Sequence, residues 1–325
     1  MSSDTSAPGL RAVAIPLWNL PQGAADVAAH VGSLDEVSPE ALRLGPFGSV
    51  LSAARGELEA SAMATLRATG LVLVPTISNR VDGHRSHDVV STMLHDPART
   101  ARHVRLLCDL VVAQDYEGVD LDYQGLGRED RAAFSRFVAR LADALHELGR
   151  RLSVTVYAKA EERLDERLTL AQDYAALGRE ADEIRLLTWD YHDATTVPGP
   201  LAPVDWVKGV LVHAVECISA KKVLLGVSAS GYDWTRGGGE RVGWAEVAAR
   251  ADRFAGGRVE HDPLGEAPWL RYLDEHDTAH EVWFEDARSV AIKRRVAGEC
   301  GARGIFLWLS ATPDIDVWAE VAHAR

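Results

Sequence analysis

Short apolar runs alternate with amphipathic helical segments along almost the whole chain. The runs are apolar on both faces at their starts, which is typical of strands that helices cover on both sides of a parallel sheet. Seven of these runs are clear, and an eighth at residues 36–44 is weaker. The clear runs are residues 12–18, 71–78, 118–123, 152–157, 184–190, 222–227 and 304–309.

The segments between these runs have the spacing of helices that lie against a sheet. The two clearest are residues 102–114 and 128–148, each with an apolar stripe along one face. Eight strands with intervening helices, joined by right-handed crossovers, predict an α/β fold of the (β/α)8 TIM barrel type. A doubly wound open sheet is the alternative that the alternation leaves open.

One stretch interrupts the alternation. Residues 235–283, between the seventh strand and the following helix, contain two glycine-rich runs and no further strand–helix repeat. They predict a small α+β insertion in the seventh βα loop, beside the mouth at which TIM barrels build their active sites. The rest of the chain is predicted to be one domain, residues 11–325, preceded by a disordered tail at residues 1–10.

Charge and cysteine usage narrow the possible partners. The formal net charge of −13 argues against nucleic acids and anionic membranes, both of which are polyanions. The three cysteines form no CxxC pair, and the histidines have no metal-binding spacing, so neither a metal nor a cofactor is expected. No signal peptide is recognisable at the start, which predicts a cytoplasmic protein. The alternative is a secreted protein whose signal peptide is absent from this sequence.

The fourth predicted strand carries polar side chains on one face. Asp120, Asp122 and Gln124 are two residues apart, so their side chains point to the same side of a strand. In a barrel that side is the interior, where carboxylates cost several kcal/mol unless they are paired or hydrogen-bonded. A ladder of this kind indicates a site for chemistry or ligand binding.

At these residues the sequence resembles glycoside hydrolase family 18, the chitinases and their relatives. The family's fourth strand carries Asp-Gly-x-Asp-x-Asp-x-Glu, and this chain reads Glu117-Gly-Val-Asp-Leu-Asp-Tyr-Gln124. Residues 187–192 are similar to the family's sixth-strand motif, and residues 304–308 to its eighth-strand segment. Residues 33–39, 231–234 and 281–289 resemble the bacterial spore-cortex-lytic N-acetylglucosaminidase branch.

The resemblance implies a substrate-assisted retaining hydrolase of glycans that contain N-acetylglucosamine, such as chitin or peptidoglycan. In such enzymes the substrate's own 2-acetamido group is the nucleophile. Carried over, Gln124 stands at the position of the acid, Asp122 at the position that orients the acetamide, and Asp120 supports Asp122. The partner implied is therefore a carbohydrate.

Gln124 is the main departure from the family pattern. An amide has no proton to donate near neutral pH, so hydrolysis is expected to be impaired. Either a glutamate has been deliberately replaced, or the site has diverged naturally. The further departures at Glu117 and at Trp189, which replaces a tyrosine, favour divergence. Three functions stay open: an impaired glycosidase, a pseudo-glycosidase that binds acetamido sugars, and a repurposed enzyme of different chemistry.

Further substrate-binding candidates lie at the predicted strand ends. Trp308 corresponds to the tryptophan that floors the family's sugar site, and Trp189, Asp190 and Tyr191 belong to the sixth-strand motif. Trp18, Tyr157 and Tyr232 also lie near strand ends, although ordinary packing explains them equally well. Glu285 and Asp286 begin a predicted helix and suit a capping role better than that of a replacement acid.

Overall fold

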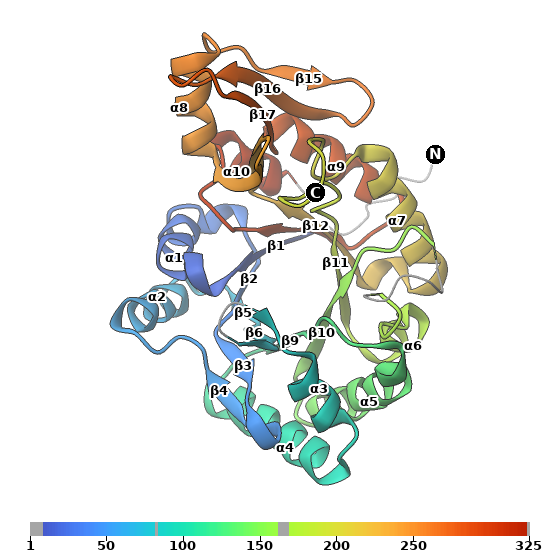
Figure 1. Ribbon diagram of the computed structural model, residues 1–325. Helices are drawn as coiled ribbons and strands as arrows, with labels where there is room; N and C mark the ends of the chain where they lie inside the picture. The colour runs from blue at the N-terminus through green and yellow to red at the C-terminus, as the bar shows by residue number, and fades with distance from the viewer. Residues whose placement is uncertain (1–8, 82–83, 162–168, 324–325) are drawn as a thin grey trace, which may run out of the picture.

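The computed structural model describes residues 9–81, 84–161 and 169–323, and its parallel strands form a closed barrel (Figure 1). Strand β18 lies between β12 and β1, and β1 pairs with β2. Strand β2 then pairs with β5, and β3 pairs with β6. From β6 the ring continues through β9, β10 and β11 back to β12. The second barrel strand is split into β2 and β3, and the third into β5 and β6. The TIM-barrel prediction is confirmed, and the open doubly wound sheet is excluded.

The barrel strands are short. Their bounds are β1 (Leu10–Ile15), β2 (Glu36–Pro39), β3 (Leu42–Leu44), β5 (Val72–Leu73), β6 (Thr76–Ser78), β9 (Gly118–Asp122), β10 (Arg151–Tyr157), β11 (Glu183–Leu187), β12 (Val223–Ser228) and β18 (Gly304–Trp308). Pro75 interrupts the third strand, where it cannot donate a ladder hydrogen bond. The tail predicted at residues 1–10 falls mostly outside the described residues, but Leu10 already belongs to β1.

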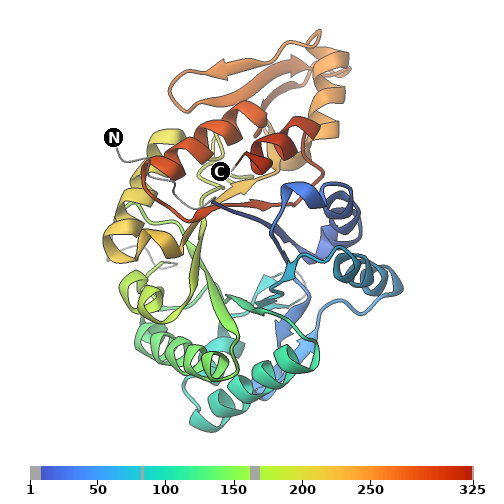
Figure 2. The same cartoon turned by 180° about the vertical axis from the view of Figure 1, so that it is seen from behind.

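An outer ring of helices covers the barrel (Figure 2). Their bounds are α1 (Leu20–Ala29), α2 (Glu57–Ala68), α3 (His87–Leu94), α4 (Pro97–Ala113), α5 (Arg131–Glu147), α6 (Tyr174–Glu180), α7 (Val204–Cys217), α9 (Ala287–Glu299) and α10 (Ile315–Ala322). Helix α4 begins five residues before the predicted 102, because Asp96 caps it by accepting hydrogen bonds from two backbone N–H groups. Among the described helices, none combines the length and apolarity needed to cross a membrane.

The predicted insertion is present and packs beside the barrel (Figure 1). It is an antiparallel sheet, in the order β14-β13-β17-β16-β15, with one helix on it. Its elements are β13 (Ser230–Thr235), β14 (Gly238–Gly243), α8 (Trp244–Phe254), β15 (Glu260–Asp262), β16 (Ala267–Leu273) and β17 (Ala279–Trp283). The sheet begins at Ser230 rather than at 235, because only Ala229 separates β13 from β12 and no turn sequence marks the boundary.

The barrel interior contains buried charges as well as apolar side chains. Arg185 on β11 is almost fully buried, and it forms ion pairs with Glu36 and with Glu183 (3.4 Å). Its guanidinium also donates to the Ser38 hydroxyl at 2.6 Å. Arg151 contacts the same two glutamates from β10. Each buried carboxylate therefore has a cationic partner, as the low polarity of the interior requires.

Candidate active site

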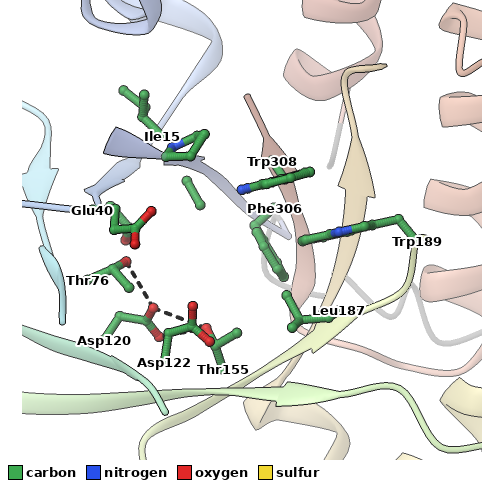
Figure 3. A pocket seen from close by; sticks show the side chains of 13 residues that line it. Ile15, Glu40, Thr76, Asp120, Asp122, Thr155, Leu187, Trp189, Phe306 and Trp308 are labelled. Atoms are coloured by element: carbon green, nitrogen blue, oxygen red, sulfur yellow. Dashed lines mark hydrogen bonds between the residues drawn. The ribbon is translucent and has the colours of Figure 1, made fainter. Parts of the chain in front are cut away.

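A cavity of about 40 Å³ opens at the carboxyl ends of the barrel strands (Figure 3). Asp120, Asp122 and Glu40 line one side of it. Trp189, Phe306 and Trp308 line the other side. The structure thus brings together the acidic ladder of the fourth barrel strand and aromatic residues of the sixth and eighth, at the face where TIM barrels hold their catalytic groups.

The period-two alternation of β9 places its carboxylates inside. Val119, Leu121 and Tyr123 are fully buried and alternate with the two aspartates. Tyr123 faces the helices, because its hydroxyl hydrogen-bonds His103 of α4 at 2.7 Å. Gly118 is required by close packing, since a Cβ there would lie 2.0 Å from the Arg151 carbonyl oxygen.

Asp120 is the deepest acid of the cavity. Thr76 and Thr155 donate hydrogen bonds to it at 3.0 Å, from the two neighbouring strands. Burial raises the pKa of Asp120, and the Arg185 cation, 3.9 Å away, opposes that rise. The side chain is therefore fixed in place, with its hydrogen-bonding capacity largely occupied by protein donors.

Asp122 is held by two side chains. Gln124 donates from its amide to Asp122 Oδ1 at 2.5 Å, and Arg85 donates to Oδ2 at 2.9 Å. Burial alone would lower the pKa of Arg85, but the charge of Asp122 raises it, so the guanidinium stays ionised. Gln124 itself turns towards Asp122 and does not line the cavity. Its backbone is anchored by Asn79, which bonds both its N–H and its carbonyl group.

Two contributors to this site had no role in the sequence analysis. Glu40 lies at the break between β2 and β3, within the weak run at residues 36–44, so no alternation predicted its direction. Its carboxylate lies 3.7 Å from Arg80 and accepts a 3.4 Å hydrogen bond from the Leu17 N–H. Arg85 comes from the short hairpin of β7 (Arg80–Val81) and β8 (His84–Arg85), which is too small to be recognised in sequence.

The aromatic wall differs from a simple sugar platform. Trp189 stacks on Trp308 with ring centroids 4.9 Å apart and nearly parallel planes. Trp189 also packs edge-on against Phe306 and fits over Gly226, where a Cβ would lie 2.5 Å from the indole. One face of Trp308 is therefore covered by the ring of Trp189. A tyrosine at position 189 would cover less of that face, because its ring is smaller.

Asp190 links the barrel to the insertion. Its backbone is in the left-handed region (φ 58°), which turns the chain sharply after β11. Its carboxylate accepts hydrogen bonds from Tyr232 at 3.0 Å and from Arg241 of β14 at 3.1 Å. Burial raises the pKa of Asp190, and Arg241 opposes that rise. A capping role is excluded, because the N-cap of α7 is Pro203.

The remaining aromatic candidates lie around the cavity rather than in it. Trp18 is half exposed at the rim and meets Trp308 edge-on at 5.7 Å. Tyr157 is close enough to Arg85 and Asp122 for their charges to affect its pKa, which burial raises. Tyr191 is half exposed and packs on Trp206 of α7 at 5.2 Å. The turn at Asp190 thus directs Tyr191 away from the cavity lining.

The acidic pair before α9 has structural contacts. Asp286 is the N-cap and accepts a hydrogen bond from the Ser289 N–H at 2.8 Å, which confirms the capping prediction. Glu285 is buried against Lys293 at 2.6 Å, so it is not a replacement acid. These contacts account for Asp286 and for one oxygen of Glu285, whereas Glu285 Oε1 is buried without a hydrogen-bond partner among the described residues.

One group in the described chain has the arrangement of a possible metal site. His87, Glu129 and Asp130 place potential ligand atoms within 4.8 Å of one another. Asp130 is buried and already accepts hydrogen bonds from His87 (2.9 Å) and Ser91 (2.7 Å). Protein donors alone thus explain the cluster, and the expectation of no metal stays a prediction.

Comparison with known proteins identifies one family and several bacterial relatives. The family described as "Glycosyl hydrolases family 18" matches residues 75–312. The putative sporulation-specific glycosylase YdhD of Bacillus subtilis is 28% identical over 255 residues, which are 77% of this chain and 60% of that protein. The cortical fragment-lytic enzyme of the same organism is 28% identical over 283 residues, which are 84% of this chain and 65% of that protein. The chain thus spans less than two thirds of either relative.

Solved structures agree with the fold. A chitinase from Chromobacterium violaceum superimposes with a TM-score of 0.89 and 26% identity, over 97% of this chain and 98% of that one. The spore cortex-lytic enzyme SleL of Bacillus cereus superimposes with a TM-score of 0.85 and 23% identity, over 97% of this chain and 75% of that one. The second likeness concerns the fold alone.

Proposed function

This chain belongs to glycosyl hydrolase family 18, and we propose that its barrel mouth binds glycans of the N-acetylglucosamine type with impaired hydrolysis. The proposal assigns Asp122 to the sugar's 2-substituent, Asp120 to the support of Asp122, and Gln124 to the position of the acid. The observation that carries it is the hydrogen bond from the Gln124 amide to Asp122, a carboxylate that lines a cavity with an aromatic wall. An amide at that position can hold a glycosidic oxygen but cannot protonate it.

The names of the relatives support the class of ligand. They include a chitinase and cortical fragment-lytic enzymes, whose names point to chitin and to the peptidoglycan of the spore cortex. A tryptophan ring such as that of Trp18, half exposed at the rim, offers an apolar face on which the C–H surfaces of sugars stack. The carbohydrate partner proposed here needs neither a metal nor a cofactor.

A pseudo-glycosidase, which binds without cleaving, is the second candidate. Arg85 and Gln124 together occupy both oxygens of Asp122, so a substrate has to share this carboxylate with protein donors. That pairing favours holding a sugar over activating it, because the paired carboxylate offers less charge to a developing cation. A repurposed enzyme is the third function, and no contact in the site specifically favours it.

Titration calorimetry with chitin oligosaccharides tests the proposal. We expect binding in the barrel mouth together with little or no cleavage of the bound oligomer. Asp122→Asn should weaken this binding, and Asp143→Asn, at an exposed position on α5 outside the cavity, is the matched control for the loss of one negative charge. Absence of binding to every acetamido sugar tried would overturn the proposal and leave the repurposed enzyme.

A further inference from the structure

Asn79 is a buried amide at the end of the third barrel strand. It directly follows β6, whose last residue, Ser78, pairs in register with Asp122 of β9. Its side chain is fully buried and does not belong to the lining of the cavity. A ligand in the cavity would therefore not contact Asn79, and any effect of this residue on the ligand has to pass through other side chains.

The Asn79 amide bonds the backbone of two other segments. Its Oδ1 accepts from the Gln124 N–H at 3.1 Å, and its Nδ2 donates to the Gln124 carbonyl at 2.8 Å. The same Nδ2 donates to the carbonyl of Ser86, the residue before α3, at 3.1 Å. These contacts use one acceptor and two donors, which a carboxamide combines in one side chain. A carboxylate here would face two carbonyl oxygens with acceptors only.

Each of these two segments brings a donor to the same carboxylate. Gln124 donates from its own side chain to Asp122 Oδ1 at 2.5 Å. Arg85, which immediately precedes Ser86, donates to Asp122 Oδ2 at 2.9 Å. Asn79 therefore joins, behind the cavity, the two stretches of chain whose side chains bond the two oxygens of Asp122.

Loss of the Asn79 amide would leave backbone groups of Gln124 buried without these partners, which is unfavourable. The segment would shift to bond other groups. Hydrogen bonds weaken steeply with distance and angle, so a small shift is enough to separate the Gln124 amide from Asp122. The segment of Arg85 would be released on the other side.

We propose that Asn79 is a positioning residue of the barrel mouth, which holds Gln124 and Arg85 where both donate to Asp122. Its consequence for a ligand rests on the proposed function, in which Asp122 meets the sugar's 2-substituent. The positioning itself does not require a ligand. The inference can therefore be tested with and without one.

The side-chain amide of Gln124 reports the positioning in the free protein. Its ¹H–¹⁵N resonances are identified by their absence from Gln124→Glu, and a proton donated to a carboxylate resonates downfield. Asn79→Ala should move that proton upfield, as Asp122→Ala does by removing the acceptor. Thr100→Ala is the matched control, because it removes another buried side-chain hydrogen bond, to the Met93 carbonyl at 2.8 Å, and should leave the resonance in place.

Calorimetry with a chitin tetramer measures the consequence for binding. Asn79→Ala should weaken binding by at least about fivefold. In an Asp122→Asn background the same substitution should change the affinity by less than about twofold, because the carboxylate that it positions is gone. If the alanine variant does not fold, Asn79→Ser, whose hydroxyl satisfies fewer of these backbone groups, replaces it in both measurements.

The outcomes separate the inference from the proposed function. An upfield shift of the Gln124 proton, with a loss of affinity that depends on Asp122, supports the inference. A folded variant with an unchanged Gln124 resonance overturns it, and so does an equal loss of affinity in both backgrounds. If the unsubstituted protein does not bind the tetramer, the proposed function fails, and the Gln124 resonance alone decides the inference.

Discussion

Arg85 donates a hydrogen bond of 2.9 Å to the Oδ2 atom of Asp122, the carboxylate nearest the mouth of the fourth barrel strand. The two side chains are about a fifth and an eighth exposed, so the pair is only partly screened by water. A ligand that uses Asp122 therefore joins an existing ion pair rather than meeting a free charge. Replacement of Asp122 should therefore affect both the ligand and Arg85.

Asp122→Ala should weaken binding of a chitin oligosaccharide by about 1.5–3 kcal/mol, the usual value for a hydrogen bond to a charged group. Calorimetry measures the loss directly. Asp122→Asn keeps the shape and is the matched control for packing. Because the alanine variant leaves Arg85 without its acidic partner, its fold has to be checked by circular dichroism. Unchanged affinity in a folded Asp122→Ala protein would remove Asp122 from the binding site.

The second expectation concerns the ionic network inside the barrel. Arg185→Met should lower the free energy of unfolding by about 3–5 kcal/mol, because Glu36 and Glu183 stay buried with one cation fewer. Urea unfolding measures the change. Arg258→Met breaks an exposed pair with Glu260 and should cost less than about 1 kcal/mol. Equal losses in the two variants would show that burial of the network contributes nothing.

The third expectation concerns pH. His103 donates from Nδ1 to the Gly48 carbonyl and accepts from the Tyr123 hydroxyl, and burial lowers its pKa to about 4. The unfolded chain binds this proton near pH 6.5, so between about pH 6.5 and 4 the unfolded state holds more protons. Stability contributed by neutral His103 is therefore present above about pH 6.5 and lost as the pH falls, by about 3 kcal/mol in total.

His103→Gln should remove this dependence. Unfolding free energies of both proteins, measured across the acidic range, give a difference curve in which other titrating groups largely cancel. The variant should be less stable at neutral pH and should lose less stability on acidification. Parallel curves would show that His103 titrates alike in the folded and unfolded states.

The features that could be predicted from the sequence are those that depend on the local periodicity of a strand or helix. Alternation along a continuous strand was enough to place Asp120 and Asp122 inside the barrel, since β9 is regular from Gly118 to Asp122. Glu40 escaped the same reasoning because it lies in a break where the strand alternation is lost. Tyr191 was assigned to the substrate side because nothing in the sequence marks the left-handed turn at Asp190 that redirects it.

Contacts between distant segments could not be predicted from the sequence either. Arg85 meets Asp122 across 37 residues, and Arg241 reaches Asp190 across 51 residues from the insertion. Arg85 lies in a strand of only two residues, and the strand of Arg241, Gly238–Gly243, has no alternation of apolar residues that would show its direction. These contacts determine the charge of the site. Its location could therefore be predicted from the sequence, whereas its chemistry depends on tertiary contacts.

The last expectation concerns Gln124. Its amide lies 2.5 Å from Asp122 Oδ1, so Gln124→Glu places a carboxyl oxygen where the donor now stands. Two carboxylates at that distance share a proton, which raises the apparent pKa of the pair. Arg85 pairs with the other oxygen of Asp122 at 2.9 Å. A carboxyl group that stays protonated near neutral pH is what a general acid requires.

Hydrolysis of an unactivated chitin oligomer should therefore rise by at least about 10²-fold in Gln124→Glu, and should fall again at alkaline pH as the glutamate loses its proton. A nitrophenyl glycoside should respond less, because its leaving oxygen barely needs protonation. Kinetics of both proteins on both substrates measure the effect. If the folded variant stays inert on each substrate, the loss extends beyond one residue. Trp189→Tyr in the same background then tests whether the acetamide contact is the missing part, since a tyrosine would restore the hydroxyl that the indole lacks.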